Sequence, residues 1–536
     1  MGIKAYVAKS PNGRSTQVQV VWKRGREVLE SRYVGTSGDA VGVALLEAKA
    51  WEVVHEGMDP LWEAGQGAGR VPHGPEPRGP GAGDAGPRVT RSYSGLLWDV
   101  LVRVWEELEF DGAVPDEAFR ALALARVVEP TSKADSARVL ADLGAWGPSA
   151  RTAFRCLARC QERGYRARLA EACWQRAGGG ASLLLYDCTT LHWEGDKEDD
   201  FRKVGYNKDR KIDPQIVVGL LVDQDGFPLM VHSFDGKKGE VNTILPVLEA
   251  FRTERQVGRM TVVADAAMLA DDVLCRLEDD EFDFIVGARI DKTPFQVVKW
   301  RRKHPGKKLK DGQVFVQPLS AGTKKEPRER TVVYQWRKDR AARDLRTIDK
   351  QVDKARQVVD GRRPAHKARF LDLAGAEPAL KQDLIDSAKD RAGIKGYVTS
   401  LPVVGAKKKA EQEPGRAVSP LLVISHYHQL WEVERSFRMS KNDLRARPMW
   451  HQDRKTIEAH LTIVFAALAV ARTIQKATGA SIRRFVRTLR PMRAADIVIA
   501  GQRTTVPPAI SADARELLDA LARGRRPVDA AEKTDD

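Results

Sequence analysis

The sequence predicts an α/β protein built around one mixed β-sheet, and three observations support this. Three apolar, strand-like runs follow one another without a helical stretch between them. Helical stretches then alternate with two further strand-like runs, and long segments of helical periodicity flank the whole region. The strand-like runs are residues 182–187, 215–223, 228–234, 260–265 and 282–289, and the helical stretches among them are 240–256 and 268–279.

This element order is β-β-β-α-β-α-β. A doubly wound fold would place a helix after each early strand, whereas here three strands come first. The order therefore favours a mixed sheet of the ribonuclease H type.

The segments before the sheet divide into three parts. Residues 3–37 alternate between apolar and polar and predict a small β-meander, which a helix at 41–56 completes to a unit of residues 1–64. Residues 65–92 are rich in Gly and Pro and predict a linker. Residues 93–178 have helical periodicity and many arginines, which suits either a DNA-binding module or a helical bundle with a solvated basic face.

The remaining chain divides around the predicted sheet. Residues 179–290 form the first part of the expected catalytic domain, 291–419 a β-rich insertion, and 420–480 the second part. Within the insertion, strand-like runs precede a highly charged helix at 337–359, whose cations suit a solvated face better than a DNA arm. Residues 481–536 should form a C-terminal helix and a polar, poorly ordered tail, with a short helix at 511–522.

Composition limits the class of partner. The chain has 536 residues, 42% of them hydrophobic, and a formal net charge of +16, which favours a polyanion. The most apolar run, 461–471, is too short to span a bilayer, and the N-terminus lacks a signal-peptide pattern, so a cytoplasmic protein is expected. Five cysteines without zinc spacing indicate free thiols in a reducing compartment.

Two aspartates follow apolar strand-like runs. Asp187 ends "LLLYD" and Asp265 ends "TVVAD". A carboxylate at the edge of a buried strand is costly unless it is solvated, paired or bound to metal, and neighbouring strands can hold two of them around one divalent cation. Asp at a strand end also caps helices and turns, so each residue alone has an ordinary structural explanation.

The third acid of the predicted site is Glu434. In the helical stretch 425–444, Tyr427, Glu434 and Lys441 recur every seven residues and should share one face, with Arg438 beside them. Leu430, Val433, Phe437 and Leu444 form an adjacent apolar stripe. An exposed Glu434–Arg438 ion pair is the simpler alternative.

Here the sequence resembles a known family. "YHQLWEVERSFRMSK" is similar to the tyrosine–arginine–glutamate–lysine signature of insertion-sequence DDE transposases of the insertion-sequence-four-like group, with Leu430 in place of the arginine. "YDCTTLHWEG", "TVVADAAM" and the block after Glu434 resemble the family's other motifs in the same order. The long stretch between Asp265 and Glu434 fits the insertion found in the family.

The resemblance implies a metal-binding catalytic triad of Asp187, Asp265 and Glu434 with two Mg²⁺ or Mn²⁺ ions. It implies cleavage at the element ends and attack of the freed 3′-hydroxyl on target DNA. The implied partners are double-stranded DNA with inverted repeats and a second copy in a homodimeric synaptic complex, in the bacterial cytoplasm at the nucleoid. The candidate DNA contacts are Tyr427, Arg438, Lys441, Lys208 and Arg210.

Two alternatives remain at this point. One is a nuclease or resolvase on the same fold, which cleaves DNA without joining it. The other is a basic DNA-binding protein that has lost its activity.

Overall fold

The computed structural model describes most of the chain beyond the first 87 residues. Before that point it describes residues 4–12, 15–24 and 27–37 and the single positions 43, 46 and 50. From there it describes 88–524 except 180–181, 194–196, 206–212, 257, 266–269, 324–325, 365–367, 374–376, 407–412, 448, 450 and 500–501. Residues 1–85 and 86–536 form two separate compact units.

The first unit is a three-stranded antiparallel sheet in the order β1-β2-β3. Its strands are β1 (Lys4–Asn12), β2 (Ser15–Arg24) and β3 (Glu27–Ser37). Val18 and Val20 of β2 are fully buried on one face, as alternation along a half-buried strand requires. The predicted helix at 41–56 and the Gly/Pro-rich part of the predicted linker lie almost wholly outside the described residues.

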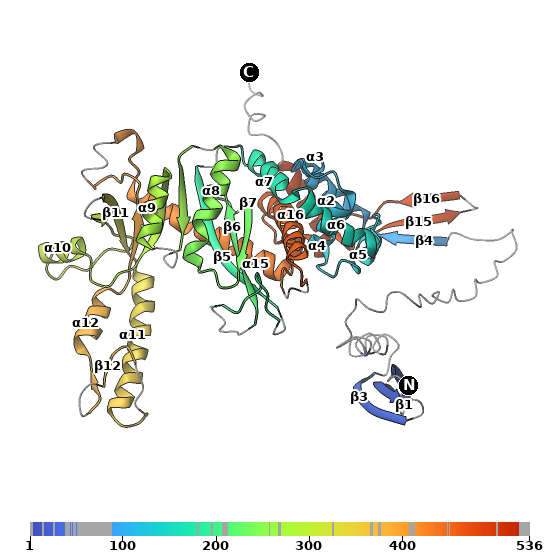
Figure 1. Cartoon of the computed structure of the whole chain (residues 1–536), viewed down its shortest axis with the longest axis horizontal. Coiled ribbons are helices and arrows are strands. Elements are labelled where there is room, and N and C mark those ends of the chain that lie inside the picture. The colour runs from blue at the N-terminus through green and yellow to red at the C-terminus, as the bar shows by residue number, and fades with distance from the viewer. Residues whose placement is uncertain are drawn as a thin grey trace, which may run out of the picture. The chain divides into compact units, whose positions relative to one another are not determined.

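The second unit is built on an eight-stranded mixed sheet in the order β10-β11-β14-β9-β8-β5-β6-β7 (Figure 1). Its three central strands, β9, β8 and β5, are parallel, and every other neighbouring pair is antiparallel. The strands are β5 (Leu183–His192), β6 (Gln215–Val222), β7 (Pro228–Asp235), β8 (Met260–Ala264), β9 (Phe282–Ala288), β10 (Val314–Gly322), β11 (Pro327–Trp336) and β14 (Ile394–Thr399). The predicted mixed α/β sheet is therefore confirmed, with its elements in the predicted order.

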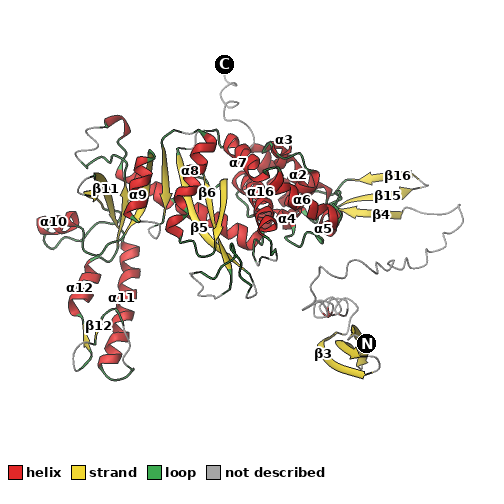
Figure 2. Ribbon diagram, viewed as in Figure 1, coloured by secondary structure: helices red, strands yellow, loops and turns green. Residues whose placement is uncertain are grey.

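Helices cover both faces of this sheet (Figure 2). On one face, α8 (Ile244–Arg255) and α9 (Asp271–Asp279) close a core that contains Leu184, Tyr186 and Phe284. On the other face lie α14 (Pro420–His428), α15 (Leu430–Arg438) and α16 (Arg454–Thr478). Leu183 and Leu185 point into this second core, because side chains alternate between the two faces of a strand.

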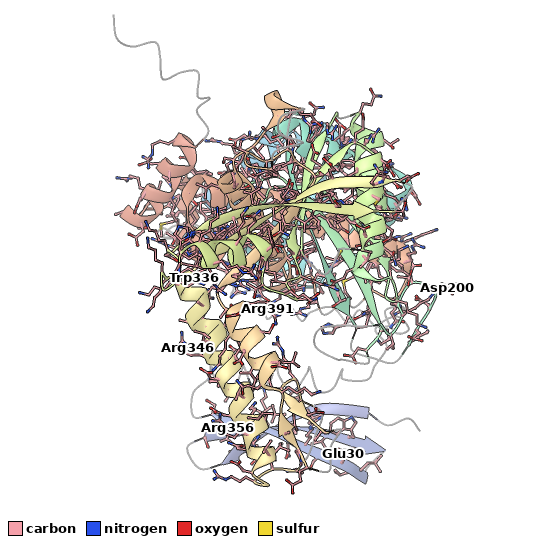
Figure 3. The ribbon with its side chains drawn as sticks, turned by 90° about the vertical axis from the view of Figure 1, so that its left-hand side faces the viewer. Glu30, Asp200, Trp336, Arg346, Arg356 and Arg391 are labelled. Carbon is pink, nitrogen blue, oxygen red and sulfur yellow. The ribbon has the colours of Figure 1, made fainter. Side chains whose placement is uncertain are left out.

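The segment 291–419 extends the same sheet, since β10, β11 and β14 add to it beyond β9. Between β11 and β14 the chain forms an arm of α11 (Lys338–Val359) and α12 (Gln382–Asp390), with the short strands β12 (Leu371–Asp372) and β13 (Ala379–Leu380). The arm has its own small core around Ile348, Val352 and Phe370. Figure 3 shows the charged side chains of Arg346 and Arg356 along α11.

The helices before the sheet pack around α16. They are α2 (Gly95–Glu107), α3 (Phe110–Ala113), α4 (Glu117–Val128), α5 (Ser136–Asp142), α6 (Ala150–Glu162) and α7 (Tyr165–Arg176), and α17 (Ile482–Leu489) and α18 (Ala512–Arg523) join them. The surface helix α10 (Phe295–Lys303) completes the described α-helices. Helix α16 is long and apolar enough to cross a membrane, but 89% of its apolar window is buried inside this bundle, as predicted for a core helix.

Two predicted boundaries are wrong. Residues 88–92, assigned to the linker, belong to β4 (Arg88–Tyr93), which pairs with β15 (Ala494–Ile499). The tail predicted to be poorly ordered from residue 503 instead continues through β16 (Gln502–Val506) of the same small sheet, whereas the predicted short helix at 511–522 is present as α18. These strands meet across about four hundred residues of chain, so local patterns could not reveal their pairing.

Candidate active site

The two predicted aspartates lie on neighbouring parallel strands. The pairing of β5 with β8 aligns Leu183 with Thr261 and Leu185 with Val263. The same register, continued by two residues, brings Asp187 opposite Asp265, where β8 has just ended. Neighbouring strands lie about 4.8 Å apart, so the register places the two carboxylates side by side.

Both aspartates face the helices α14 and α15. Asp187 shares a strand face with Leu185, and Asp265 shares one with Val263, and both of these apolar residues belong to the core under these helices. Asp187 is half-buried and Asp265 is exposed. Asp187 does not end its strand as predicted, because pairing with β6 carries β5 on to His192.

Tyr427 from α14 closes one side of this pair. Its side chain is buried, and its phenol donates a hydrogen bond of 3.4 Å to Oδ1 of Asp265. Burial raises the pKa of Tyr427, and the negative charge of Asp265 and this hydrogen bond raise it further, so the phenol stays protonated. The predicted signature tyrosine therefore contacts one of the predicted acids directly.

Strand β14 supplies residues that the sequence analysis missed. The ammonium of Lys395 lies 4.3 Å from the ring centroid of Tyr427, and Tyr397 packs on the same ring with centroids 4.9 Å apart. Burial lowers the pKa of Lys395, the charge of Arg340 lowers it further, and Asp265 opposes both. Lys395 and Tyr397 alternate along the strand "IKGYVT", but only the sheet order reveals that this strand lies beside β9, one strand away from β8.

Glu434 lies on α15, which packs on β5 and β6. Its carboxylate is exposed, with 66% of the side chain accessible, and accepts a bond of 2.9 Å from Arg438. The stripe expected to dock this helix is confirmed, since Val433, Phe437 and Leu444 are buried. In this structure Glu434 therefore forms the exposed ion pair with Arg438, which is the simpler alternative to a metal-binding role.

The predicted continuous helix 425–444 is wrong in detail. It divides at Gln429 into α14 and α15, where Glu432 N bonds to Gln429 O over three residues, and ends in a π-helical turn, Met439–Asp443. The tightened turn rotates α15 relative to α14, so Tyr427 points inward while Glu434 points to solvent.

The remaining predicted contacts lie in two places. Lys441 lies in the π-helical turn and lines a small cavity of about 30 Å³ with Thr189 of β5, two residues beyond Asp187. Lys208 and Arg210 lie outside the described residues.

No group of three or more His, Cys, Asp or Glu side chains able to hold a metal ion occurs among the described residues. Asp187 and Asp265 are paired by the sheet, but Glu434 is not held with them. The two aspartates suit a hard divalent cation, which takes carboxylate oxygens and usually few of them from protein.

Paired aspartates on neighbouring central strands of a mixed sheet, with a glutamate on a helix that covers the same face, define a candidate acidic site. Residues 178–470 match the family model described as "Transposase DDE domain", and the chain belongs to this family. No curated protein matches the chain.

A solved structure, the cryo-EM structure of the piggyBac transposase synaptic complex with hairpin DNA, is similar to 61% of this chain at 10% sequence identity and a TM-score of 0.34. The similar region spans 55% of that transposase chain, about half of its length. The family match, and not this weak similarity, defines the class.

Proposed function

We propose that the protein is a DNA transposase that cleaves DNA at the ends of its element and joins the freed 3′-hydroxyl to target DNA. One observation carries the proposal: the β5–β8 register that brings Asp187 opposite Asp265 on the face covered by α14 and α15. The family match supports the same class of reaction.

The strand order supports a ribonuclease H-like catalytic core. When strands β5 to β9 are numbered one to five in chain order, their order across the sheet, starting from β7, is three, two, one, four, five. The insertion-sequence-four-like group is the proposed branch of the family. Tyr427, Glu434 and Lys441 fit its signature, and the contact of Tyr427 with Asp265 gives the tyrosine a physical role.

The proposed ligands of Mg²⁺ or Mn²⁺ are Asp187, Asp265 and Glu434. A bound metal pair would activate the attacking oxygen and stabilise the leaving one. Other side chains of the protein position the metal-binding carboxylates. Tyr427 holds the Asp265 carboxylate through its hydrogen bond, and the ammonium of Lys395 adds positive charge beside it. Glu434 joins the aspartates when its carboxylate leaves Arg438, which is then free to bind a DNA phosphate.

The proposed partners are double-stranded element ends and target DNA, bound by a homodimer at the nucleoid. Two ends must meet before joining, and a homodimer would supply one active site for each end. The net charge of +16 supports a polyanionic partner. Arg151, Arg155 and Arg168 are exposed on α6 and α7 and keep a DNA-binding role open for the helical bundle.

The test uses labelled duplexes that carry the DNA flanking the coding region, a supercoiled target and Mg²⁺. We expect cleaved and joined products with the wild type and none with Asp187→Asn. The matched control is Asp225→Asn, at the exposed turn between β6 and β7 and ion-paired with Lys476, which should keep full activity. Equal activity of wild type and Asp187→Asn would reject the acidic site.

The same reaction separates the transposase from its rivals. Cleavage without joined products would indicate a nuclease or resolvase on this fold. DNA binding without cleavage, in the wild type as in Asp187→Asn, would indicate a DNA-binding protein without activity.

A further inference from the structure

An arginine-lined groove lies next to the helix that carries Glu434. Its cavity of about 890 Å³ is bounded by the end of α4, the π-helical turn, α17 and the chain that follows α17. Five arginines line it against two acids, Glu129 and Asp443. The arginines are Arg445, Arg483, Arg487, Arg490 and Arg493.

Three of these arginines are tied down by ion pairs. Arg490 bonds to Glu129 at 2.8 Å and to Asp142 at 2.9 Å, and Arg483 bonds to Asp443 at 2.6 Å. Arg493 bonds to Asp142 at 2.7 Å. These pairs fix the walls of the groove and leave its net charge positive.

The other two are available. Neither Arg445 nor Arg487 has a side-chain hydrogen bond or ion pair with any residue that the structure describes, and both are exposed. A guanidinium that is free, exposed and surrounded by other cations suits an anionic ligand with several charges.

The backbone at Arg445 is held in an uncommon conformation. Its φ of +43° is in the left-handed region that side chains other than Gly rarely adopt. Arg126, a buried arginine of α4, holds it there by donating to the carbonyls of Leu444 and Arg445, each at 3.0 Å. Burial of a cation is costly, and strained backbone gathers at functional sites, so this arrangement indicates a use for the side chain of Arg445.

We infer that this groove binds the phosphate backbone of duplex DNA and leads it to the acidic site. Arg445 and Arg487 each contact a phosphate, and Arg126 is a positioning residue for Arg445. Asn442 on the groove wall lies in the π-helical turn that directly continues the helix of Glu434, eight residues further along the chain, so the groove begins where this helix ends. The inference rests on the proposed function and adds the path of the DNA.

The test measures the affinity of the full chain for a 30-base-pair duplex of arbitrary sequence at stepped salt concentrations. In the double variant Arg445→Gln/Arg487→Gln, the slope of log affinity against log salt should become shallower by about two, and the affinity for unrelated sequences should weaken equally. The control Arg276→Gln removes one charge from α9, on the other face of the sheet, and should keep the wild-type slope.

A second variant separates binding from folding. Arg445→Gly removes the guanidinium but relieves the left-handed backbone, so we expect a higher Tm together with weaker DNA binding. Wild-type slope and affinity in the double variant would overturn the inference, as would a change in dimer formation with unchanged DNA binding. If the wild type and Asp187→Asn both fail to bind DNA, the proposed function fails instead.

Discussion

At the centre of the sheet two carboxylates lie side by side near solvent, whereas in the helical bundle three basic side chains lie inside the core. Asp187 is half-buried and Asp265 exposed, while Arg126, Lys133 and His460 are all less than one-tenth exposed. The aspartates remain available to a cation from solution. The buried basic groups cannot reach a substrate and act on their neighbours instead.

The comparison distinguishes charged side chains that can take part in a reaction from those that stabilise the fold. Arg126 keeps its charge at a cost, since burial lowers its pKa to about 10, and it fixes the turn at Leu444 and Arg445. Lys133 and His460 lie 2.7 Å apart, and burial lowers the pKa of both, helped by the charge of Arg126. Burial therefore disfavours the charged form of both groups.

The strongest way to break this comparison is to neutralise one carboxylate of the sheet. Asp265→Asn should lower strand cleavage about a thousand-fold, because losing a metal ligand removes several kcal/mol of transition-state stabilisation. Its stability should not fall, because one of two neighbouring like charges is gone. Single-turnover cleavage and thermal unfolding measure the two effects. A large loss of Tm would show instead that Asp265 stabilises the fold.

The corresponding change in the bundle is Arg126→Met. It leaves two carbonyls without a partner, so the free energy of unfolding should fall by about 2 kcal/mol. Arg120→Met on the same helix breaks a more exposed pair with Asp111 and should cost less than about 1 kcal/mol. Urea unfolding measures the free energy of unfolding of both variants. Equal losses in the two variants would show that Arg126 does not stabilise the turn.

The histidines packed in the bundle sharpen the comparison through pH. Burial lowers the pKa of His451 to about 3, with help from the charges of Lys133 and Arg126, while an unfolded histidine titrates near 6.5. The unfolded chain thus binds more protons between these values, so stability is complete above about pH 6.5 and falls as pH falls toward 3.

Between pH 7 and 5, His451 should contribute a loss of up to about 1.4 kcal/mol per pH unit. Urea unfolding at both pH values should show a smaller loss in His451→Asn and an unchanged loss in His304→Asn, outside the bundle. The same pH dependence in His451→Asn and the wild type would show that His451 titrates normally.

The smallest expected effect concerns Glu434. Arg438→Gln breaks an exposed pair four residues apart on a helix, so stability should change by less than about 0.5 kcal/mol. Because Glu434 no longer has to leave Arg438, the Mg²⁺ concentration for half-maximal cleavage should fall about twofold. A rise in that concentration would mean that Arg438 holds Glu434 ready for metal.

Sequence patterns predicted the strands and helices of the sheet well, because apolar alternation and helical periodicity are local. They also selected Asp187, Asp265, Tyr427 and Glu434. They could not find Lys395, since the order of strands in a sheet depends on partners far apart in sequence. They placed Tyr427 and Glu434 on one face because residues seven apart share a face in a regular helix, but the turn at Gln429 separates them.

By itself the sequence determined the mixed sheet, the selection of three candidate acids and a positive charge that favours a polyanion, because composition and periodicity are properties of the chain alone. Only the tertiary structure decided which strands are neighbours, that α16 lies inside the bundle, and that Arg126 fixes the turn before the arginine-lined groove. The physical reason is that register, burial and cation pairing arise from contacts between segments distant in sequence, which no local pattern encodes.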